Sequence, residues 1–309
     1  MIFRVTTLRC LLFALFALFA LSASAQTVRI GVFTLFHPLQ LEIEPVGSTA
    51  LVLTDAHAPL ILNGERGHRR AIVYFAEGNL LVGEDLASSI KVAARDGSAA
   101  DFILSVPGKI TRHYRGVLTV SADEKQLVPV ISMDIETATA SVVAAESPPL
   151  AAIEALKAQA VVARSFLYSG RRHQDYDFCD TTHCQFLRQP PDHESSAFKA
   201  TRDTRGLILT WHGEPLAAMY SSRCGGKTMS LRDLGIAATG YPYFAVECSY
   251  CRRHGAQWTR TLSPAGEGAG HGLGLCQYGA AGMAAKGATF GAILRHYYPE
   301  TELKSIPSQ

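Results

Sequence analysis

The sequence predicts an α+β protein, in which a β-rich N-terminal region is followed by a mixed α/β region. Short apolar segments rich in branched residues run from Val28 to about Val130, and turn residues separate them at intervals of roughly ten residues. A stretch from Leu150 to Tyr168 then has the pattern of a helix and contains neither Gly nor Pro. Beyond this helix, short apolar stretches alternate with polar and glycine-rich loops.

The first 25 residues differ in composition from the rest of the chain. Arg4 and Arg9 precede an apolar run from Leu11 to Leu21, which is followed by the small residues Ala23-Ser24-Ala25. This pattern predicts a secretory signal peptide at residues 1–25, and the run is too short for a transmembrane anchor. We therefore expect export to the periplasm, or to the cell wall or medium outside the cell, with no stable membrane anchor.

The overall composition narrows the function classes. The chain has 309 residues, of which 48% are hydrophobic and 18% are charged, and its formal net charge is +2. A chain of this composition can bury a sizeable core and has no basic excess, so neither disorder nor nucleic-acid binding is expected. We expect the β-rich region to span residues 26–108 and the second region to span residues 109–309.

Five segments of the N-terminal region have the length and composition of β-strands. They are Val28–Leu35, Leu39–Ile43, Leu51–Thr54, Ala71–Phe75 and Leu80–Val82. Between the last two, Glu77-Gly78-Asn79 suits a hairpin turn. Because none of these segments carries a chemical motif, we interpret the region as a structural or wall-contacting module.

The second region opens with Ser147-Pro148-Pro149 and the helix at 150–168, which Gly170 ends. Its apolar residues recur at helical spacing and predict one buried face: Ile153, Leu156, Ala160 and Ala163. Later segments predict, in order, a hairpin, an irregular loop and two short helices separated near Gly287. They are Leu207–Trp211 with Leu216–Tyr220 around His212-Gly213, then Pro264–Gly274, then Gly279–Tyr298 before Pro299.

The polar loop after Gly170 holds residues with the chemistry of a metal site. His173, Cys179, His183 and Cys184 lie within twelve residues. Two thiolates and two imidazoles form a tetrahedral zinc set, and four protein ligands leave no open position for catalysis. The alternative is a Cys179–Cys184 disulfide, which leaves the histidines unexplained. We favour a structural zinc ion as the cofactor.

Four further cysteines follow the predicted signal peptide: Cys224, Cys248, Cys251 and Cys276. They could form two disulfides or a Cys₄ metal site. In an exported protein we favour disulfides, and the sequence does not give the pairing.

Four blocks of sequence occur in a fixed order in the second region. They are Val142–Pro148 with Glu154–Ser165, then Cys179–Gln185, Tyr220–Thr228 and Gly270–Ala280, with His296-Tyr297-Tyr298-Pro299 near the end. Together they closely resemble the stage II sporulation protein D family, also called the amidase-enhancer family, over about Tyr114 to Leu303. The family includes members with zinc at the Cys179–Cys184 segment, whereas many members have serine where Cys224 and Cys276 stand here.

The resemblance implies a lytic transglycosylase that acts on peptidoglycan glycan strands, preferably those already stripped of their stem peptides. Such an enzyme cleaves between N-acetylmuramic acid and N-acetylglucosamine and leaves a 1,6-anhydro ring. Ordinary glycosidases use two carboxyl groups. Here the 6-hydroxyl of the sugar is the nucleophile, so one Glu can protonate the leaving oxygen and then accept the hydroxyl proton.

Two glutamates compete for the catalytic role. Glu146 follows the apolar residues Val142–Ala145, and an apolar setting raises a carboxyl pKa as a general acid requires. Its position matches the family's Glu before Met-Pro, although Ser147 replaces the Met. Glu154 lies on the helix three residues before Lys157, a spacing typical of a solvated helix contact. We favour Glu146.

Residues of the last two blocks are expected to contact the glycan, by offering hydroxyls, neutral hydrogen-bonding groups, a stacking ring or close approach to the backbone. They are Tyr220, Ser221, Ser222, Gly225, Gly226, Thr228, His271 and Gln277. The alternative function is a non-catalytic wall-binding protein that stimulates an N-acetylmuramoyl-L-alanine amidase, which would then be a partner. The two glutamates favour the enzyme.

Overall fold

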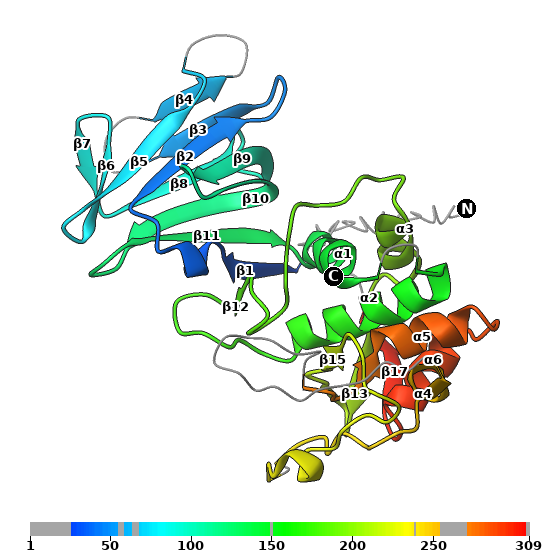
Figure 1. Cartoon of the computed structure of the whole chain (residues 1–309). Helices are drawn as coiled ribbons and strands as arrows, with labels where there is room; N and C mark the ends of the chain where they lie inside the picture. Colours follow the sequence, from blue (N-terminus) through cyan, green and yellow to red (C-terminus); the bar gives the residue numbers. More distant parts are fainter. Residues whose placement is uncertain are drawn as a thin grey trace, which may run out of the picture.

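The computed structural model describes residues 26–54, 59–63, 68–148, 151–237, 239–253 and 271–306 (Figure 1). The predicted signal peptide and residues 264–270 of the glycine-rich loop lie outside these ranges, as do Pro149 and Leu150. A β-rich half precedes a half built from helices and short strands, which confirms the predicted α+β class. No helix among the described residues is long and apolar enough to span a bilayer.

The β-rich half forms one layered sheet around a continuous apolar core. Its elements are β1 (Thr27–Gly31), η1 (Thr34–Phe36), β2 (Gln40–Pro45), β3 (Ala50–Thr54), β4 (Leu60–Asn63), β5 (Ala71–Ala76), β6 (Asn79–Val82), β7 (Asp85–Ala87), β8 (Ser89–Ala94), β9 (Ala100–Val106), β10 (Ile110–Ala122) and β11 (Leu127–Asp134). The long strand β10 pairs with β9 through its first half and with β8 and β11 through its second. The sheet thus continues to Asp134, beyond residue 108, and the domain boundary placed there stays a prediction.

The five strands predicted for this half are present, but the first of them is shorter than predicted. Alternate residues of β2 are buried, as expected of a strand with one face on a core. Glu77 and Gly78 both have positive φ, the conformation required at the two centres of a tight hairpin turn. The segment predicted as a strand over Val28–Leu35 ends at Gly31, because Phe33 is left-handed and η1 follows it.

The second half is assembled around α2 (Ile153–Tyr168). Its other elements are α1 (Ile135–Glu146), β12 (Phe178–Cys179), α3 (Ser196–Asp203), β13 (Leu207–Trp211), β14 (Glu214–Pro215), β15 (Tyr220–Ser221), η2 (Arg232–Leu234), α4 (Ser249–Arg253), β16 (Leu275–Cys276), α5 (Gln277–Ala284), α6 (Phe290–Tyr297) and β17 (Glu302–Ser305). Because α2 contacts α1, α3, α5, α6 and β13, it is buried on several sides rather than on one face. Ile153, expected in the buried face, is 39% exposed, since it begins the helix.

Helix α1 was not predicted from the sequence. Asp134 caps it, because its carboxylate accepts a hydrogen bond from the Thr137 N–H at 3.0 Å. The hydroxyls of Thr139 and Ser141 donate to carbonyls one turn earlier, so these buried polar side chains are satisfied within the helix. The helix ends at Glu146 and thereby places this residue at the junction with α2.

The C-terminal elements agree with the prediction in part. β13 and β14 form a hairpin around His212 and Gly213, but β14 has only two residues. Instead of extending it, Tyr220 and Ser221 form β15, which pairs in parallel with β16. The two short helices α5 and α6 are separated around Gly287, as predicted.

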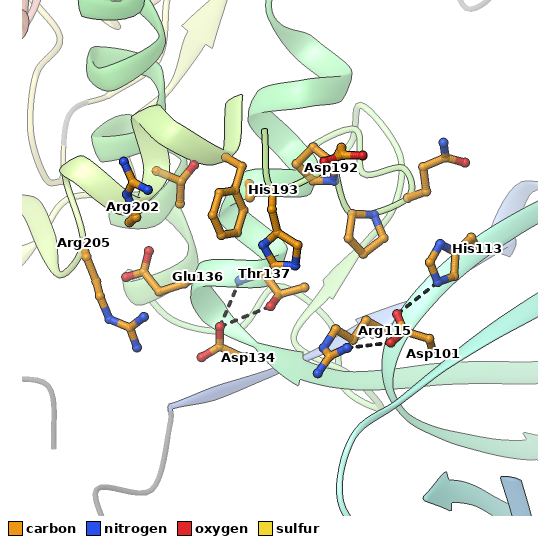
Figure 2. A pocket seen from close by; sticks show the side chains of 16 residues that line it. Asp101, His113, Arg115, Asp134, Glu136, Thr137, Asp192, His193, Arg202 and Arg205 are labelled. Atoms are coloured by element: carbon orange, nitrogen blue, oxygen red, sulfur yellow. Dashed lines mark hydrogen bonds and ion pairs between the residues drawn. The ribbon is translucent and has the colours of Figure 1, made fainter. Parts of the chain in front are cut away.

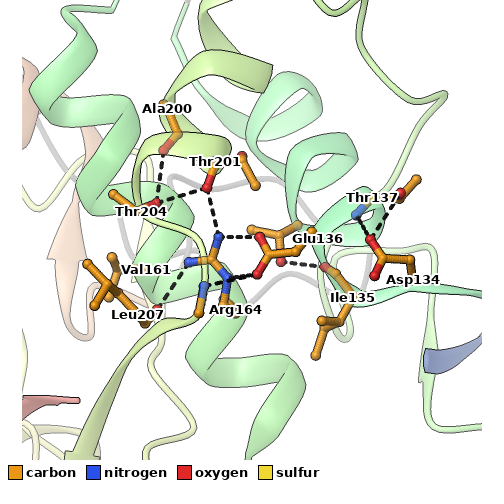
Figure 3. A network of polar contacts seen from close by, with 12 residues as sticks. Asp134, Ile135, Glu136, Thr137, Val161, Arg164, Ala200, Thr201, Thr204 and Leu207 are labelled. Carbon is orange, nitrogen blue, oxygen red and sulfur yellow. Dashed lines mark hydrogen bonds and ion pairs between the residues drawn. The ribbon is translucent and has the colours of Figure 1, made fainter. Parts of the chain in front are cut away.

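A buried ion pair connects the elements around α2 (Figure 3). Arg164 on α2 is fully buried, and its guanidinium binds both carboxylate oxygens of Glu136 on α1, at 2.9 and 2.6 Å. The same guanidinium donates to the carbonyls of Thr201 on α3 and Leu207 on β13. One side chain therefore joins three helices and a strand.

Candidate functional site

Glu146 is the last residue of α1, and its side chain faces Phe186, which follows the loop that carries the predicted zinc ligands. One carboxylate oxygen accepts the Phe186 backbone N–H at 2.7 Å. The Tyr220 hydroxyl is buried beside this carboxyl, although it makes no hydrogen bond of standard geometry. Arg188 adds a positive charge nearby. Neither Phe186 nor Arg188 was predicted as a site residue, because a backbone N–H has no side-chain signature and Arg188 lies outside the four sequence blocks.

Burial raises the pKa of Glu146 above its usual range. The Phe186 N–H, the Tyr220 hydroxyl and the Arg188 charge stabilise the ionised form and offset this rise only in part. The negative end of the α1 dipole also disfavours a carboxylate at this position. The surroundings therefore favour the protonated form of this carboxyl group more than water does.

Glu154 has the opposite surroundings. Its carboxylate accepts the Phe290 N–H at 2.7 Å, at the first turn of α6, and the Lys157 ammonium at 3.0 Å. The Phe290 N–H is the main reason that the pKa of Glu154 is lowered. The contact with Lys157 expected from their spacing is present, and Glu154 in addition links α2 to α6.

The parallel pair β15 and β16 brings several predicted glycan-contact residues next to Glu146. Tyr220 and Ser221 lie on β15, and the Ser221 hydroxyl is buried without a partner within the described part of the chain. Gln277 directly follows β16 and donates from its side-chain amide to the Glu146 backbone carbonyl at 2.9 Å. The amide of Gln277 thus fixes the end of α1 against the start of α5.

The turn after β15 holds four more predicted contact residues. Ser222 and Gly225 are exposed, whereas Gly226 is buried, with a φ of 119° that L side chains rarely adopt. The Thr228 hydroxyl is occupied within the protein, because it donates to the Phe244 carbonyl at 3.1 Å and accepts the Val246 N–H at 2.9 Å. Thr228 therefore holds this turn rather than offering a free hydroxyl.

His271 is the predicted contact residue in the glycine-rich loop. Its Nδ1 accepts the Leu273 N–H at 3.0 Å, so the ring proton is assigned to Nε2. Burial lowers the pKa of His271, and the imidazole is therefore neutral at pH 7. A neutral donor at Nε2 can hydrogen-bond a sugar hydroxyl.

The four predicted zinc ligands converge. The ligand atoms of His173, Cys179, His183 and Cys184 all lie within 4.8 Å of one another. The Cys184 sulfur lies 3.3 Å from His173 Nε2 and 3.6 Å from His183 Nδ1. Such separations match the edges of a tetrahedron around zinc with bonds of about 2.0–2.3 Å. Both cysteines are free thiols, so the residues present fit the ion and do not form the alternative disulfide.

The β-rich half supports this cluster of ligands. Cys179 lies on β12, which pairs in parallel with β1 opposite Gly31. The Tyr176 ring packs where a Gly31 side chain would stand, and it lies 4.5 Å from the His173 ring, centroid to centroid. Asp180 is buried and accepts from the Phe33 N–H and from Arg112. The loop that runs on to Phe186 is therefore fixed at its base.

Metal binding at this cluster should be lost when a ligand is changed. We expect Cys184→Ser to remove one zinc ion per chain and to lower the midpoint of thermal unfolding, because the ion cross-links the loop. Elemental analysis and calorimetry of the purified protein would measure both. An unchanged zinc content in this variant would contradict the assignment.

A cavity is present elsewhere among the described residues. It has a volume of about 740 Å³ and is lined by β9, β10, α1, α3 and the loop before α3 (Figure 2). Asp101, held by His113 and Arg115, stands on one side, and Glu136 and Arg202 stand on the other. Neither Glu146 nor Glu154 lines this cavity, so it is separate from the candidate site.

Comparison with known proteins agrees with the first two of the four sequence blocks, whereas the blocks Tyr220–Thr228 and Gly270–Ala280 lie outside the family match. Residues 123–211 match the family model described as stage II sporulation protein, SpoIID. An uncharacterized protein of Brachyspira hyodysenteriae is 26% identical in an alignment 262 positions long, and the match covers 60% of this chain and 70% of that protein. The SpoIID match contains α1, α2 and the cluster of His173, Cys179, His183 and Cys184, called here the first metal cluster. The family is linked to peptidoglycan hydrolysis. Residues 123–211 of the chain therefore form a SpoIID domain, and the chain is similar to the stage II sporulation protein D family over that part.

Proposed function

We propose that the protein is a lytic transglycosylase that cleaves peptidoglycan glycan strands between N-acetylmuramic acid and N-acetylglucosamine. The observation that carries this proposal is the contrast between the two glutamates. Burial favours the protonated form of Glu146, whereas hydrogen bonds to Phe290 and Lys157 favour the ionised form of Glu154. Of these two glutamates, Glu146 is thus the one suited to donate a proton.

In the proposed reaction the Glu146 carboxyl donates its proton to the glycosidic oxygen as the bond to the muramic acid C1 breaks. The 6-hydroxyl of the same sugar then attacks C1, and its proton passes to the Glu146 carboxylate, which restores the acid. No water is consumed, so the product carries a 1,6-anhydro ring. The Phe186 N–H and Arg188 stabilise the carboxylate between the two steps.

By this proposal Tyr220, Ser221 and His271 contact the sugars of the glycan strand. A zinc ion bound by the first cluster would act as a cross-link of the loop, because four protein ligands occupy its coordination sphere. By this proposal the cluster acts through the Phe186 N–H, which follows Cys184 by two residues and binds the acid. We further propose that the protein is exported and acts in the periplasm or at the wall.

Product analysis distinguishes this reaction from others. Incubation of purified glycan strands without stem peptides should release fragments ending in 1,6-anhydro-N-acetylmuramic acid, which mass spectrometry identifies by the loss of one water relative to a hydrolysed end. Reducing N-acetylmuramic acid ends would instead indicate hydrolysis. No cleavage, together with faster release of peptides by an added amidase, would support the non-catalytic alternative.

A further inference from the structure

The four cysteines outside the first cluster also converge, although they come from separate segments. Cys224 follows β15, Cys248 precedes α4, Cys251 lies on α4 and Cys276 ends β16. Their sulfur atoms all lie within 4.8 Å of one another, and each residue is at most 4% exposed. A buried point is thus surrounded by four thiol groups and lies apart from the ligands in the loop after Gly170.

The sulfur geometry is that of a metal centre and not of disulfides. All four cysteines are free, and the sulfurs of Cys251 and Cys276 are 3.5 Å apart, whereas a disulfide bond measures about 2.05 Å. Zinc–sulfur bonds of about 2.3 Å in a tetrahedron put the sulfurs about 3.8 Å apart. The two disulfides favoured from the sequence are therefore corrected. The sequence-based argument rested on the oxidising compartment, which says nothing about where the side chains meet.

The groups around the sulfurs are those that stabilise thiolates. The Gly279 N–H donates to the Cys276 sulfur at 3.3 Å, in the first turn of α5, and the Tyr297 hydroxyl lies 3.6 Å from the Cys248 sulfur. Hydrogen bonds of this kind orient metal ligands. A Cβ on Gly279 would lie 2.5 Å from the Cys248 sulfur. Because Gly279 has no side chain, α5 can pack closely against Cys248 and Tyr297. The spacing Cys248-x₂-Cys251 is also common in zinc sites.

We propose that Cys224, Cys248, Cys251 and Cys276 bind a second zinc ion as a tetrathiolate centre. Each thiol gives its proton to solvent as its sulfur binds, so that four protons are released for one zinc ion taken up. With four protein ligands the ion is structural. It needs no oxidant and keeps the thiols from forming disulfides in an exported chain.

This centre fixes the side of the site that faces Glu146. Cys276 immediately precedes Gln277, whose amide holds the Glu146 carbonyl, and Cys224 lies three residues after Ser221. The ion would therefore join β15, α4 and α5 into one unit. Because the metal content can be measured without glycan, this inference stands or falls independently of the proposed reaction.

The first experiment uses the exported wild-type protein, so that no variant needs to fold. We expect two zinc ions per chain by elemental analysis, and free thiols at all four positions when cysteines are alkylated in denaturant without reductant and mapped by mass spectrometry. One zinc ion per chain, or disulfides among these four cysteines, would overturn the proposal.

Matched cysteine variants assign the second ion to its ligands. Cys251→Ser should retain one zinc ion, and Cys184→Ser, which changes the first cluster, should retain the other. Replacing zinc by cobalt then distinguishes the two sites. The cobalt ion that remains in Cys184→Ser is bound by four thiolates, whereas the cobalt ion that remains in Cys251→Ser is bound by two. The sulfur-to-cobalt charge-transfer absorption should therefore be about twofold stronger in Cys184→Ser. Two zinc ions in a folded Cys251→Ser protein, or equal absorption in the two variants, would contradict the assignment.

Discussion

Glu146→Gln should lower the rate of glycan cleavage by about 10²–10⁴-fold while folding and glycan binding persist. The substitution keeps the shape of the side chain and can still contact the Phe186 N–H, but it removes the titrating proton. The rate is measured as the appearance of anhydro ends, and binding is measured by sedimentation with insoluble glycan.

The pH dependence of glycan cleavage is a second test of Glu146 as the acid. The acid must be protonated to act, so wild-type activity should fall as pH rises through the raised pKa of Glu146. That decline should be absent from the residual activity of Glu146→Gln. A rate that is still limited by the same ionisation in this variant would assign the acid to another residue.

Glu154→Gln is the matched control, because it makes the same change eight residues away. It should cost little activity and a modest amount of stability, since the Phe290 N–H and Lys157 lose a charged acceptor. Loss of cleavage in Glu154→Gln with retention in Glu146→Gln would reverse the assignment. Full activity in both variants would assign the acid to a residue other than these two glutamates.

Arg164→Met should lower the free energy of unfolding by about 3–5 kcal/mol. The change leaves the Glu136 carboxylate, whose side chain is only 14% exposed, without its guanidinium partner. It also leaves the carbonyls of Thr201 and Leu207 without this donor. Urea unfolding followed by circular dichroism measures the effect.

Arg70→Met provides the comparison for an exposed ion pair. Arg70 contacts Glu42 at 3.2 Å with its side chain 55% exposed, and such pairs contribute about 0–1 kcal/mol. Adding Glu136→Leu to Arg164→Met should recover part of the lost stability, because no uncompensated charge then remains buried. If Arg164→Met were as mild as Arg70→Met, the buried pair would not join the helices as described.

The parts of the fold that followed from sequence are those with a local pattern. β2 shows alternating burial, the Glu77-Gly78 turn needs two positive φ angles, and α2 has a long run of good helix formers. Helix α1 lacks such a pattern, because its threonines, serine and valines favour helices weakly and most of its residues are buried. Its capping residue Asp134 was the one local signal.

In the candidate site too, only the features encoded by a local pattern could be predicted from the sequence. The first metal cluster lies within one loop, so its spacing alone predicted that the ligands could meet. The second cluster brings Cys224 and Cys276 together through the pairing of β15 with β16, and no local spacing encodes that contact. Thr228 and Gln277 offer the right chemistry for a sugar, yet their polar groups bind the protein itself.

The pairing of β12 with β1 means that Thr27–Gly31, at the start of the described chain, supports the strand that carries Cys179 of the first metal cluster. In the sheet order, β1 lies between β12 and β11, so it covers one edge of each. A fragment cut at residue 109 would lack β1, and it would present both edges bare, as a template for pairing with other chains. The two halves of the protein are therefore not interchangeable modules. A graft of the Cys179 loop into another scaffold would have to bring Thr27–Gly31 with it.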